Sequence, residues 1–257
     1  PEMTGAANKG QKLSSEAMKQ RKNLVKQLLS LLLKLVHHSD DNFEDRERVI
    51  AVVNREDTLT NLSSLLPKER VGKVQKVVVE LLLLAIISDE ARTAAAKASI
   101  LFNLVQLISI SMAHSNGKHD KSSDHSSSRL PKIVELVTAL VRGHLQNSTE
   151  LVECGVLALL LDLLSPHSTS SLTVEISRLL AVLSPFPLSH GFITSAISQV
   201  TQLVSSPAPE IVENGLTILA NLTAVPESRA IVFNDHTVTT VMPLMSSPKP
   251  GIQLQAA

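Results

Sequence analysis

Residues 205–248 read SSPAPEIVENGLTILANLTAVPESRAIVFNDHTVTTVMPLMSSP, and this stretch begins and ends with Ser-Ser-Pro. A similar tripeptide, Leu-Ser-Pro, ends at Pro166, and the interval from Pro166 to Pro207 equals the interval from Pro207 to Pro248. The resulting period of about 41 residues lies within the range of roughly 20–50 that is typical of proteins built from stacked repeats. The stretch is therefore interpreted as one complete repeat unit.

Apolar residues ahead of each proline keep the same period. Three sets recur at this interval: Val156, Ile197 and Val238; Leu159, Val200 and Val241; and Leu163, Val204 and Met245. Within one unit these positions fall at i, i+3 and i+7, which places them on one face of an α-helix. We expect the Ser-Pro sequence to end this helix, because proline has no N–H and its ring clashes with the preceding turn.

A second helix is expected after each Ser-Pro sequence. Pro209 suits the first turn of such a helix, and the apolar pattern continues from Ile211 to Leu222. The corresponding helix of the preceding unit runs from Ile176 to Leu183, at an offset two residues shorter than the period. A short third segment, at 149–155 and at 228–232, completes each unit.

Residues 150–166, ELVECGVLALLLDLLSP, and residues 216–222, LTILANL, resemble the two parts of the armadillo repeat consensus. The resemblance is most specific over 147–257 and extends upstream over 16–146, where HEAT repeats are the competing assignment. It implies an all-α fold, a right-handed α-α superhelix of about five repeats. The whole chain is expected to form one such solenoid over 14–257, preceded by a disordered tail at 1–13.

The upstream part of the chain keeps the pattern with one interruption. We expect helices over 43–54, 58–66, 71–88 and 130–145, the third of them covered on both sides. Residues 113–129 are polar and serine-rich, and they are predicted to form a disordered insertion between two helices. Because the sequence stops inside the last helix of a repeat, we interpret the chain as a fragment whose last repeat is truncated.

The composition argues against several classes of partner. Lys and Arg total 24 and Asp and Glu total 24, so the chain has no excess of positive charge for binding nucleic acid. The apolar run 28–36 is shorter than the roughly 20 residues that cross a bilayer, so membrane insertion is not expected. The chain has one cysteine, Cys154, which fits a reducing compartment, and a cytoplasmic location is predicted.

The sequence contains no recognisable catalytic or cofactor-binding motif. His114, His119 and His125 match no zinc-ligand spacing, and Cys154 is interpreted as a buried structural residue rather than a nucleophile. We therefore expect neither metal nor cofactor, and no enzymatic activity. The insertion does carry candidate phosphorylation sites, at Ser122, Ser123, Ser126, Ser127 and Ser128.

The armadillo resemblance implies a binding surface, because the third helix of each armadillo repeat lines a concave groove that holds extended peptides or partner helices. Asn221 stands at the position of the family's groove asparagine, whose amide pairs with a ligand's backbone. The further groove residues implied in this chain are Thr217, Asn214, Glu213, Glu210, Arg178, Glu175, Glu135 and Lys132. An alternative interpretation of these residues is an ordinary solvated helix face.

Two functions follow from the resemblance. The first is a non-enzymatic scaffold or adaptor that binds a protein or peptide partner in the concave groove. The second is a regulatory or client-binding domain, of the co-chaperone type, in a larger protein whose own chain occupies the groove. The sequence predicts neither the identity of the partner nor the oligomeric state.

Overall fold

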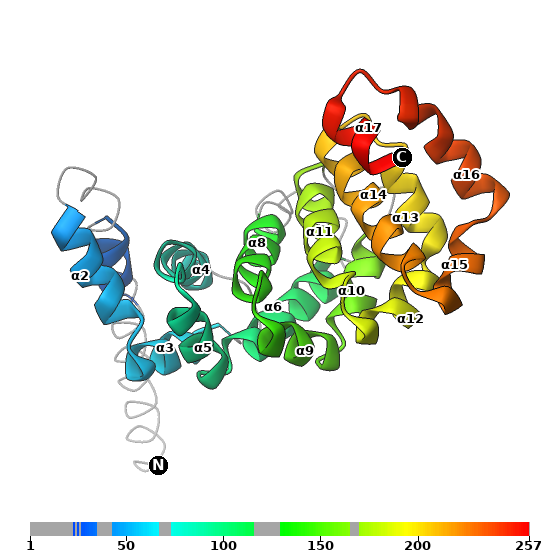
Figure 1. The fold of residues 1–257 in the computed structure, drawn as a ribbon. Coiled ribbons are helices and arrows are strands. Elements are labelled where there is room, and N and C mark those ends of the chain that lie inside the picture. Colours follow the sequence, from blue (N-terminus) through cyan, green and yellow to red (C-terminus); the bar gives the residue numbers. More distant parts are fainter. Residues whose placement is uncertain are drawn as a thin grey trace, which may run out of the picture.

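The computed structural model describes residues 23, 25, 27–34, 43–66, 73–115, 129–164 and 170–256. Every labelled element in these ranges is a helix, and together they form one curved row (Figure 1). The elements are α2 (Phe43–Val53), α3 (Glu56–Ser63), α4 (Lys73–Ala85), α5 (Asp89–Lys97), α6 (Ile100–Ser115), α8 (Leu130–Val141), α9 (Leu145–Glu153), α10 (Val156–Leu163), α11 (Ser170–Leu183), α12 (Pro187–Ser195), α13 (Ile197–Val204), α14 (Pro209–Thr223), α15 (Pro226–Val232), α16 (Asp235–Val241), the 3-10 helix η2 (Met242–Ser246) and α17 (Pro250–Ala256).

The helices are grouped into stacked units. Three units follow one another as α9–α11, α12–α14 and α15–α17, and α5, α6 and α8 form a similar unit upstream. The unit before that has two labelled helices, α3 and α4. These five units agree with the predicted all-α solenoid of about five repeats.

The last helix of each unit packs against the last helix of the next unit. Contacts join α4 to α8, α8 to α11, α11 to α14 and α14 to α17. These helices lie along the concave side of the arch in Figure 1, whereas the short helices α5, α9 and α12 line its opposite edge. We call the exposed side of α4, α8, α11, α14 and α17 the concave face.

The helix boundaries around the repeated Ser-Pro sequence were predicted correctly in two units. Helix α10 spans Val156–Leu163 and α13 spans Ile197–Val204, each beginning and ending at the residues of the repeated apolar pattern. Helix α14 begins at Pro209, as the fixed φ of proline at the first helical position favours. The Ser-Pro sequence therefore ends the second helix of these units, as expected.

Five predicted helices end earlier than expected. Helix α2 stops at Val53 rather than at residue 54, and α4 stops at Ala85 rather than at residue 88. Helix α8 stops at Val141 rather than at residue 145, because the chain turns at Gly143, which has φ +73°. Helix α3 ends at Ser63 instead of residue 66. In the last unit α16 ends at Val241, and residues 242–246 tighten into the 3-10 helix η2, which contains Pro243 near its start.

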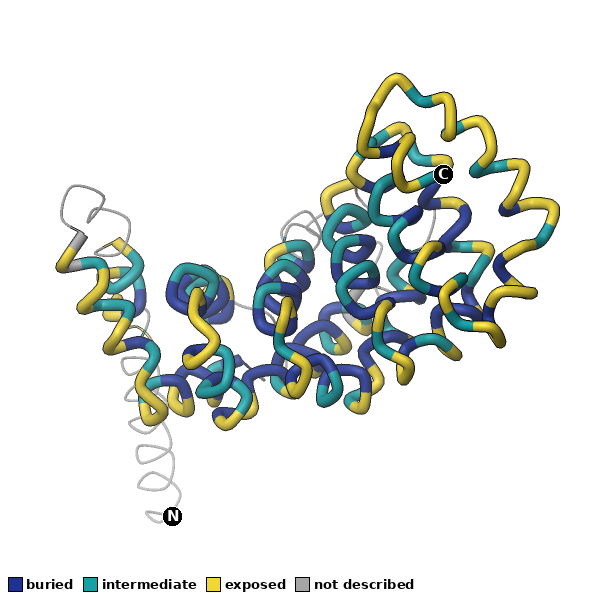
Figure 2. Tube along the Cα trace, in the orientation of Figure 1, coloured by how far each residue is buried: buried dark blue, intermediate teal, exposed yellow. Residues whose placement is uncertain are grey.

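The hydrophobic core runs without interruption through the described units. The buried residues are mostly Leu, Ile and Val, and they occur along the whole arch of described units (Figure 2). Buried hydroxyl groups close the junctions between units: Ser148 Oγ bonds to the Val141 carbonyl at 3.1 Å and Ser189 Oγ to the Leu183 carbonyl at 2.7 Å. These serines satisfy the last carbonyl groups of α8 and α11, which have no partner within their own helices.

Part of the predicted domain organisation lies outside the described residues. This applies to the tail at 1–13 and to residues 116–128 of the predicted insertion, including all five candidate phosphorylation sites. The segment between the flanking helices is shorter than the predicted insertion at 113–129, because α6 continues to Ser115 and α8 begins at Leu130. Within the described ranges no single helix has the length and apolar character of a membrane span, and the α5–α6 pair, bent by 70°, passes that test only when both helices are taken together.

Candidate functional site

The predicted groove residues occupy three neighbouring helices of the concave face. Lys132 and Glu135 lie on α8, Glu175 and Arg178 on α11, and the other five on α14. All nine are at least partly exposed to solvent. The structure therefore brings the predicted residues to adjacent helices, and it also links most of them to one another.

Arg178 connects two units through carboxylates. Its Nη1 lies 2.8 and 2.7 Å from the two carboxylate oxygens of Glu175, one turn earlier on α11. Its Nη2 donates to Glu210 Oε1 at the start of α14. A second ion pair, from Lys132 Nζ to Glu135 Oε2 at 2.8 Å, lies on α8. The concave face thus carries both signs of charge, largely paired.

The electrostatic environment shifts the pKa of two of these residues, Glu175 and Arg178. Burial raises the pKa of the Glu175 carboxyl above its usual value, and the nearby charges of Glu135 and Glu210 add to this rise against the opposing effect of Arg178. The hydrogen bond to Glu210 raises the pKa of Arg178, which keeps the guanidinium charged. Glu175 is the least exposed member of this cluster, and Glu210 is the most exposed.

The asparagines of α14 are bound to the preceding unit. Asn214 Nδ2 donates to Ser177 Oγ at 3.0 Å, and Asn221 Nδ2 donates to Ser184 Oγ at 2.8 Å. An amide has two N–H donors and one acceptor oxygen, so each serine uses one of the donors. The Asn221 amide is thereby held in a fixed orientation, with a donor and an acceptor left for other partners.

The far side of the predicted groove borders α17. Thr217 Oγ1 lies 2.6 Å from Gln255 Oε1, and it donates to the Glu213 carbonyl at 2.9 Å. The Glu213 carboxylate approaches Gly251 so closely that a Cβ there would lie 3.1 Å from Glu213 Oε1. Contacts with α17 therefore leave Glu213 and Thr217 only partly exposed.

A pocket between α4 and α8 adds residues that the sequence patterns did not indicate. It measures about 260 Å³ and is lined by Gln75, Lys76, Val79, Glu80, Leu107, Arg129, Lys132 and Ile133. Lys132 belongs to the predicted set, whereas Lys76 and Glu80 form an ion pair at 3.6 Å on α4. Lys76 on α4 lies one repeat before Lys132 on α8. The predicted insertion lengthens the interval between these two residues beyond one repeat period, so the repeat pattern does not reveal Lys76 in the sequence.

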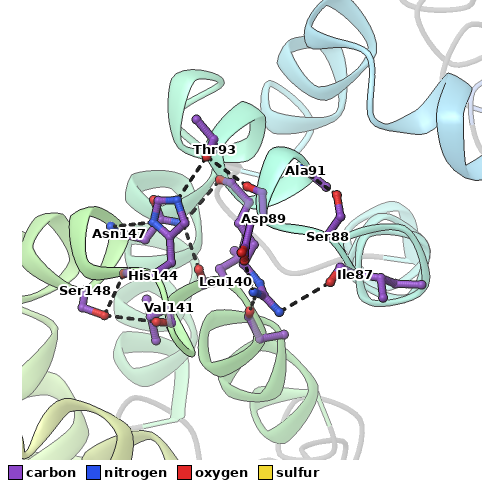
Figure 3. A network of polar contacts seen from close by, with 12 residues as sticks. Ile87, Ser88, Asp89, Ala91, Thr93, Leu140, Val141, His144, Asn147 and Ser148 are labelled. Carbon is purple, nitrogen blue, oxygen red and sulfur yellow. Dashed lines mark hydrogen bonds and ion pairs between the residues drawn. The ribbon is translucent and has the colours of Figure 1, made fainter.

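A further polar network lies away from the concave face, where α5, α8 and α9 meet (Figure 3). Arg92 donates to the Ala139 carbonyl at 3.1 Å and pairs with Asp89 at 2.6 Å. His144 Nδ1 accepts the Asn147 N–H at 3.2 Å, which places the imidazole proton on Nε2, 3.1 Å from Thr93 Oγ1. Asn147 Nδ2 donates to the Leu140 carbonyl at 2.8 Å. These contacts join the unit formed by α5, α6 and α8 to the unit α9–α11. The His144 side chain serves as the N-cap of α9.

The described residues provide little for metal binding or nucleophilic catalysis. No group of three or more His, Cys, Asp and Glu side chains that could hold a metal ion occurs in the part of the chain that the structure describes. His119 and His125 lie outside that part. Burial, together with the charges of Glu150 and Glu153, raises the pKa of the Cys154 thiol, which disfavours the reactive thiolate.

Comparison with known proteins identifies the fold. No protein-family model and no curated protein sequence matches the chain. Among solved structures, a designed armadillo repeat protein, YIII(Dq)4CqI, is similar with a TM-score of 0.70 and 20% identity, over 89% of this chain and 90% of that one.

Two further designed armadillo structures are similar at 16% identity and a TM-score of 0.65, each over 88% of this chain and 96% of its own. One is YIII(Dq.V1)4CPAF in complex with peptide (KR)4, and the other is described as computationally designed for modular peptide recognition. Identities this low establish the fold alone. The chain therefore has an armadillo-like repeat fold.

Proposed function

We propose that this chain is a non-enzymatic scaffold that binds an extended protein or peptide segment along its concave face. The observation that supports this most directly is the fixed orientation of Asn214 by the buried Ser177 of α11 and of Asn221 by the buried Ser184 directly after it. Two amides held in place two turns apart on one helix present donors and acceptors at a set spacing, which suits recognition of a peptide backbone. A fixed amide also loses little conformational entropy on binding.

The charges suggest how a ligand would be recognised. Arg178, Glu175 and Glu210 form a paired cluster at the centre of the concave face, and Lys132 with Glu135 forms a second pair on α8. A ligand that carries both signs of charge can exchange these internal pairs for external ones without leaving a charge unpaired. We therefore propose a partner of mixed charge rather than a strongly basic or acidic one.

The proposal also includes the cellular location of the protein and a binding role in place of a catalytic one. We propose a cytoplasmic location, supported by a composition with a single cysteine, which is free and partly buried. The armadillo-like fold is shared with designed peptide-recognition proteins, which supports a binding role over a catalytic one.

Selection from a random peptide display library tests the proposal. The bait is the full chain, and the groove variant carries Lys132→Glu and Glu210→Lys, which reverse two exposed charges without changing the net charge. The matched control carries Lys97→Glu and Glu227→Lys, at exposed positions on the short helices α5 and α15.

Peptides enriched on the wild-type chain should bind the control equally and the groove variant at least about tenfold more weakly, a loss of roughly 1.4 kcal/mol. Peptides that bind both variants equally would place the binding surface elsewhere. A chain that enriches no peptide would contradict the scaffold and favour the alternative, in which the groove is occupied by the parent protein's own chain.

A further inference from the structure

The pocket between α4 and α8 combines buried aliphatic residues with exposed cations. Val79, Leu107 and Ile133 line it, and each of them is almost fully buried. Lys76 and Lys132 also line it, and both of these residues are exposed to solvent. Because α4 and α8 are helices of the concave face, the pocket belongs to the proposed binding surface, and it lies between two internal units of the solenoid.

The described residues that line the pocket carry an excess of positive charge. Lys76, Arg129 and Lys132 are cations, and Glu80 is the one carboxylate among them. Lys132 pairs with Glu135, which does not line the pocket, and the cations still outnumber the carboxylates when Glu135 is counted. An anionic group of a ligand is therefore favoured beside these side chains.

The ion pair between Lys76 and Glu80 is easily exchanged. Lys76 Nζ lies 3.6 Å from Glu80 Oε1, and the two side chains are 58% and 32% exposed. Ion pairs between side chains this exposed are weak, because water screens the charges and two long side chains must be held in one geometry. A carboxylate of a ligand can therefore take the place of Glu80 beside Lys76.

The size of the pocket suits a side chain of a polypeptide. Its volume of about 260 Å³ is below the roughly 300–1,000 Å³ that is typical of sites for drug-sized ligands. A branched aliphatic side chain can lie against Val79, Leu107 and Ile133, and its removal from water favours binding. The pocket thus fits an aliphatic group that has a negative charge close to it.

The interface between α11 and α14 has the opposite balance of charge. Arg178 lies between two carboxylates there, those of Glu175 and Glu210, and Glu213 adds a third carboxylate on α14. The excess of cations is therefore a local property of the α4–α8 pocket. It distinguishes the part of a partner that binds at this pocket from the part that binds at α14.

We propose that the α4–α8 pocket receives one branched aliphatic side chain from an acidic stretch of the protein partner, whose flanking carboxylates contact Lys76 and Lys132. This inference rests on the proposed function, because it assigns one subsite of the same concave face and one short segment of the mixed-charge partner. Successive side chains of an extended segment point in opposite directions, so one residue enters the pocket while its neighbours stay at the surface. The flexible lysine side chains reach the carboxylates there.

A defined peptide tests this inference. The probe is a fluorescein-labelled peptide, Gly-Ser-Asp-Glu-Leu-Glu-Asp-Ser-Gly, which is titrated with the full chain and followed by fluorescence anisotropy. One matched peptide has serine in place of the leucine, and a second has lysine in place of the four acidic residues. We expect the probe to bind saturably and at least about tenfold more tightly than either matched peptide, a difference of roughly 1.4 kcal/mol.

Variants of the chain locate the binding. Lys76→Glu should weaken binding of the probe at least about tenfold. The matched control Lys97→Glu makes the same change in net charge at an exposed position of α5, on the opposite edge of the arch, and should leave binding unchanged. Glu80→Gln removes the carboxylate that competes for Lys76, so it should strengthen binding, an effect that misfolding cannot produce.

Methyl resonances show whether the leucine enters the pocket. In NMR titrations, the methyl groups of Val79, Leu107 and Ile133 should shift with the probe and much less with the peptide that has serine in place of leucine. Binding that leaves these resonances in place, or that Lys76→Glu does not weaken, would overturn the inference.

The outcome for the pocket can be told apart from the outcome for the proposed function. The probe could fail to bind while peptides selected from the display library bind in a manner that depends on Lys132 and Glu210. The concave face would then be a peptide-binding surface, and the acidic ligand assigned to the α4–α8 pocket would be wrong. Failure of the probe and of the library together would contradict both proposals.

Discussion

The Asn221 side chain in α14 donates a hydrogen bond of 2.8 Å to the hydroxyl of Ser184, directly after the end of α11. Two turns earlier, Asn214 makes the same contact with Ser177 at 3.0 Å. Both serines are fully buried, and each also donates to a carbonyl of its own helix. The two longest helices of the C-terminal half are therefore held in register by matching polar pairs seven residues apart.

A double-mutant cycle on Asn221→Ala and Ser184→Ala should give a coupling free energy of about 1 kcal/mol, because the contact is partly buried and each partner loses it when the other is removed. Urea denaturation of the four proteins measures it. The matched cycle pairs Ser184→Ala with Thr223→Ala, whose hydroxyl bonds only locally, to Ala220. That cycle should be additive. Additivity in both cycles would mean that the Asn221–Ser184 contact contributes nothing to stability.

Ser99→Gly should stabilise the protein by roughly 0.5–1 kcal/mol. Ser99 has φ +55°, at the turn between α5 and α6, and Gly155 has φ +76° at the equivalent turn between α9 and α10. A side chain in this left-handed region costs about 1–2 kcal/mol, which glycine avoids. Thermal and urea unfolding of the variant check the gain.

Ala196 provides the control for this prediction, since it occupies the equivalent turn before α13 with φ −107°. Ala196→Gly should destabilise by at least about 0.5–1 kcal/mol, because it adds freedom to the unfolded chain and removes a methyl group that is buried in the core. Equal effects of the two substitutions would show that backbone strain at Ser99 is not relieved by glycine.

The repeated apolar pattern predicted the fold because each helix buries the same positions in every unit. The Ser-Pro sequence correctly predicted where α10 and α13 end, and both helices contain the predicted apolar positions. The pattern fails where one residue overrides it. Gly143 ends α8 through its positive φ, although Leu145 follows in helical spacing after Val141. Pro243 accompanies the change from α16 to the 3-10 helix η2, although the apolar residues continue there.

The candidate site was predicted only as a set of positions. The offset between units placed Arg178 and Asn221 on neighbouring helices correctly. The offset did not predict the hydrogen bond from Arg178 to Glu210 or the one from Asn221 to Ser184. These bonds join residues 32 and 37 positions apart in the sequence, and they depend on how two helices pack against each other.

Gly215→Ala should destabilise the protein by about 1–2 kcal/mol through overpacking, although alanine has the higher helix propensity. A Cβ at this position would lie 3.0 Å from Val204 Cγ2, 3.2 Å from Leu203 Cβ and 3.3 Å from the Val204 backbone nitrogen. The backbone of α13 cannot move aside without disturbing the core, and overpacking of this kind costs about 1–3 kcal/mol. Gly191→Ala on α12 is the matched control, since nothing lies within 4 Å of its Cβ position. It should stabilise by up to about 1 kcal/mol, and a similar gain at Gly215 would contradict the close packing of α13 and α14.

The contribution of Glu175 to stability should decrease as the pH rises. Burial raises the pKa of this carboxyl above 4.5 in the folded protein, so the folded state binds more protons than the unfolded state in the window that begins near pH 4.5 and extends upward. The stabilisation is fully present below that window and is lost as the pH rises through the folded pKa. Urea denaturation of the wild type and of Glu175→Gln between pH 3 and 7 measures this contribution, and the wild type should lose stability relative to the variant over that window.

Glu90 should give the opposite slope in the same experiment. Hydrogen bonds from its own backbone N–H and from Ser88 lower the pKa of the Glu90 carboxyl, so the folded state binds fewer protons than the unfolded state below about pH 4.5. Its contribution is present above that pH and is lost as the pH falls through the folded pKa. Relative to Glu90→Gln, the wild type should therefore gain stability as the pH rises from 3. Parallel slopes for the Glu175 and Glu90 variants would show that burial does not control the ionisation of Glu175.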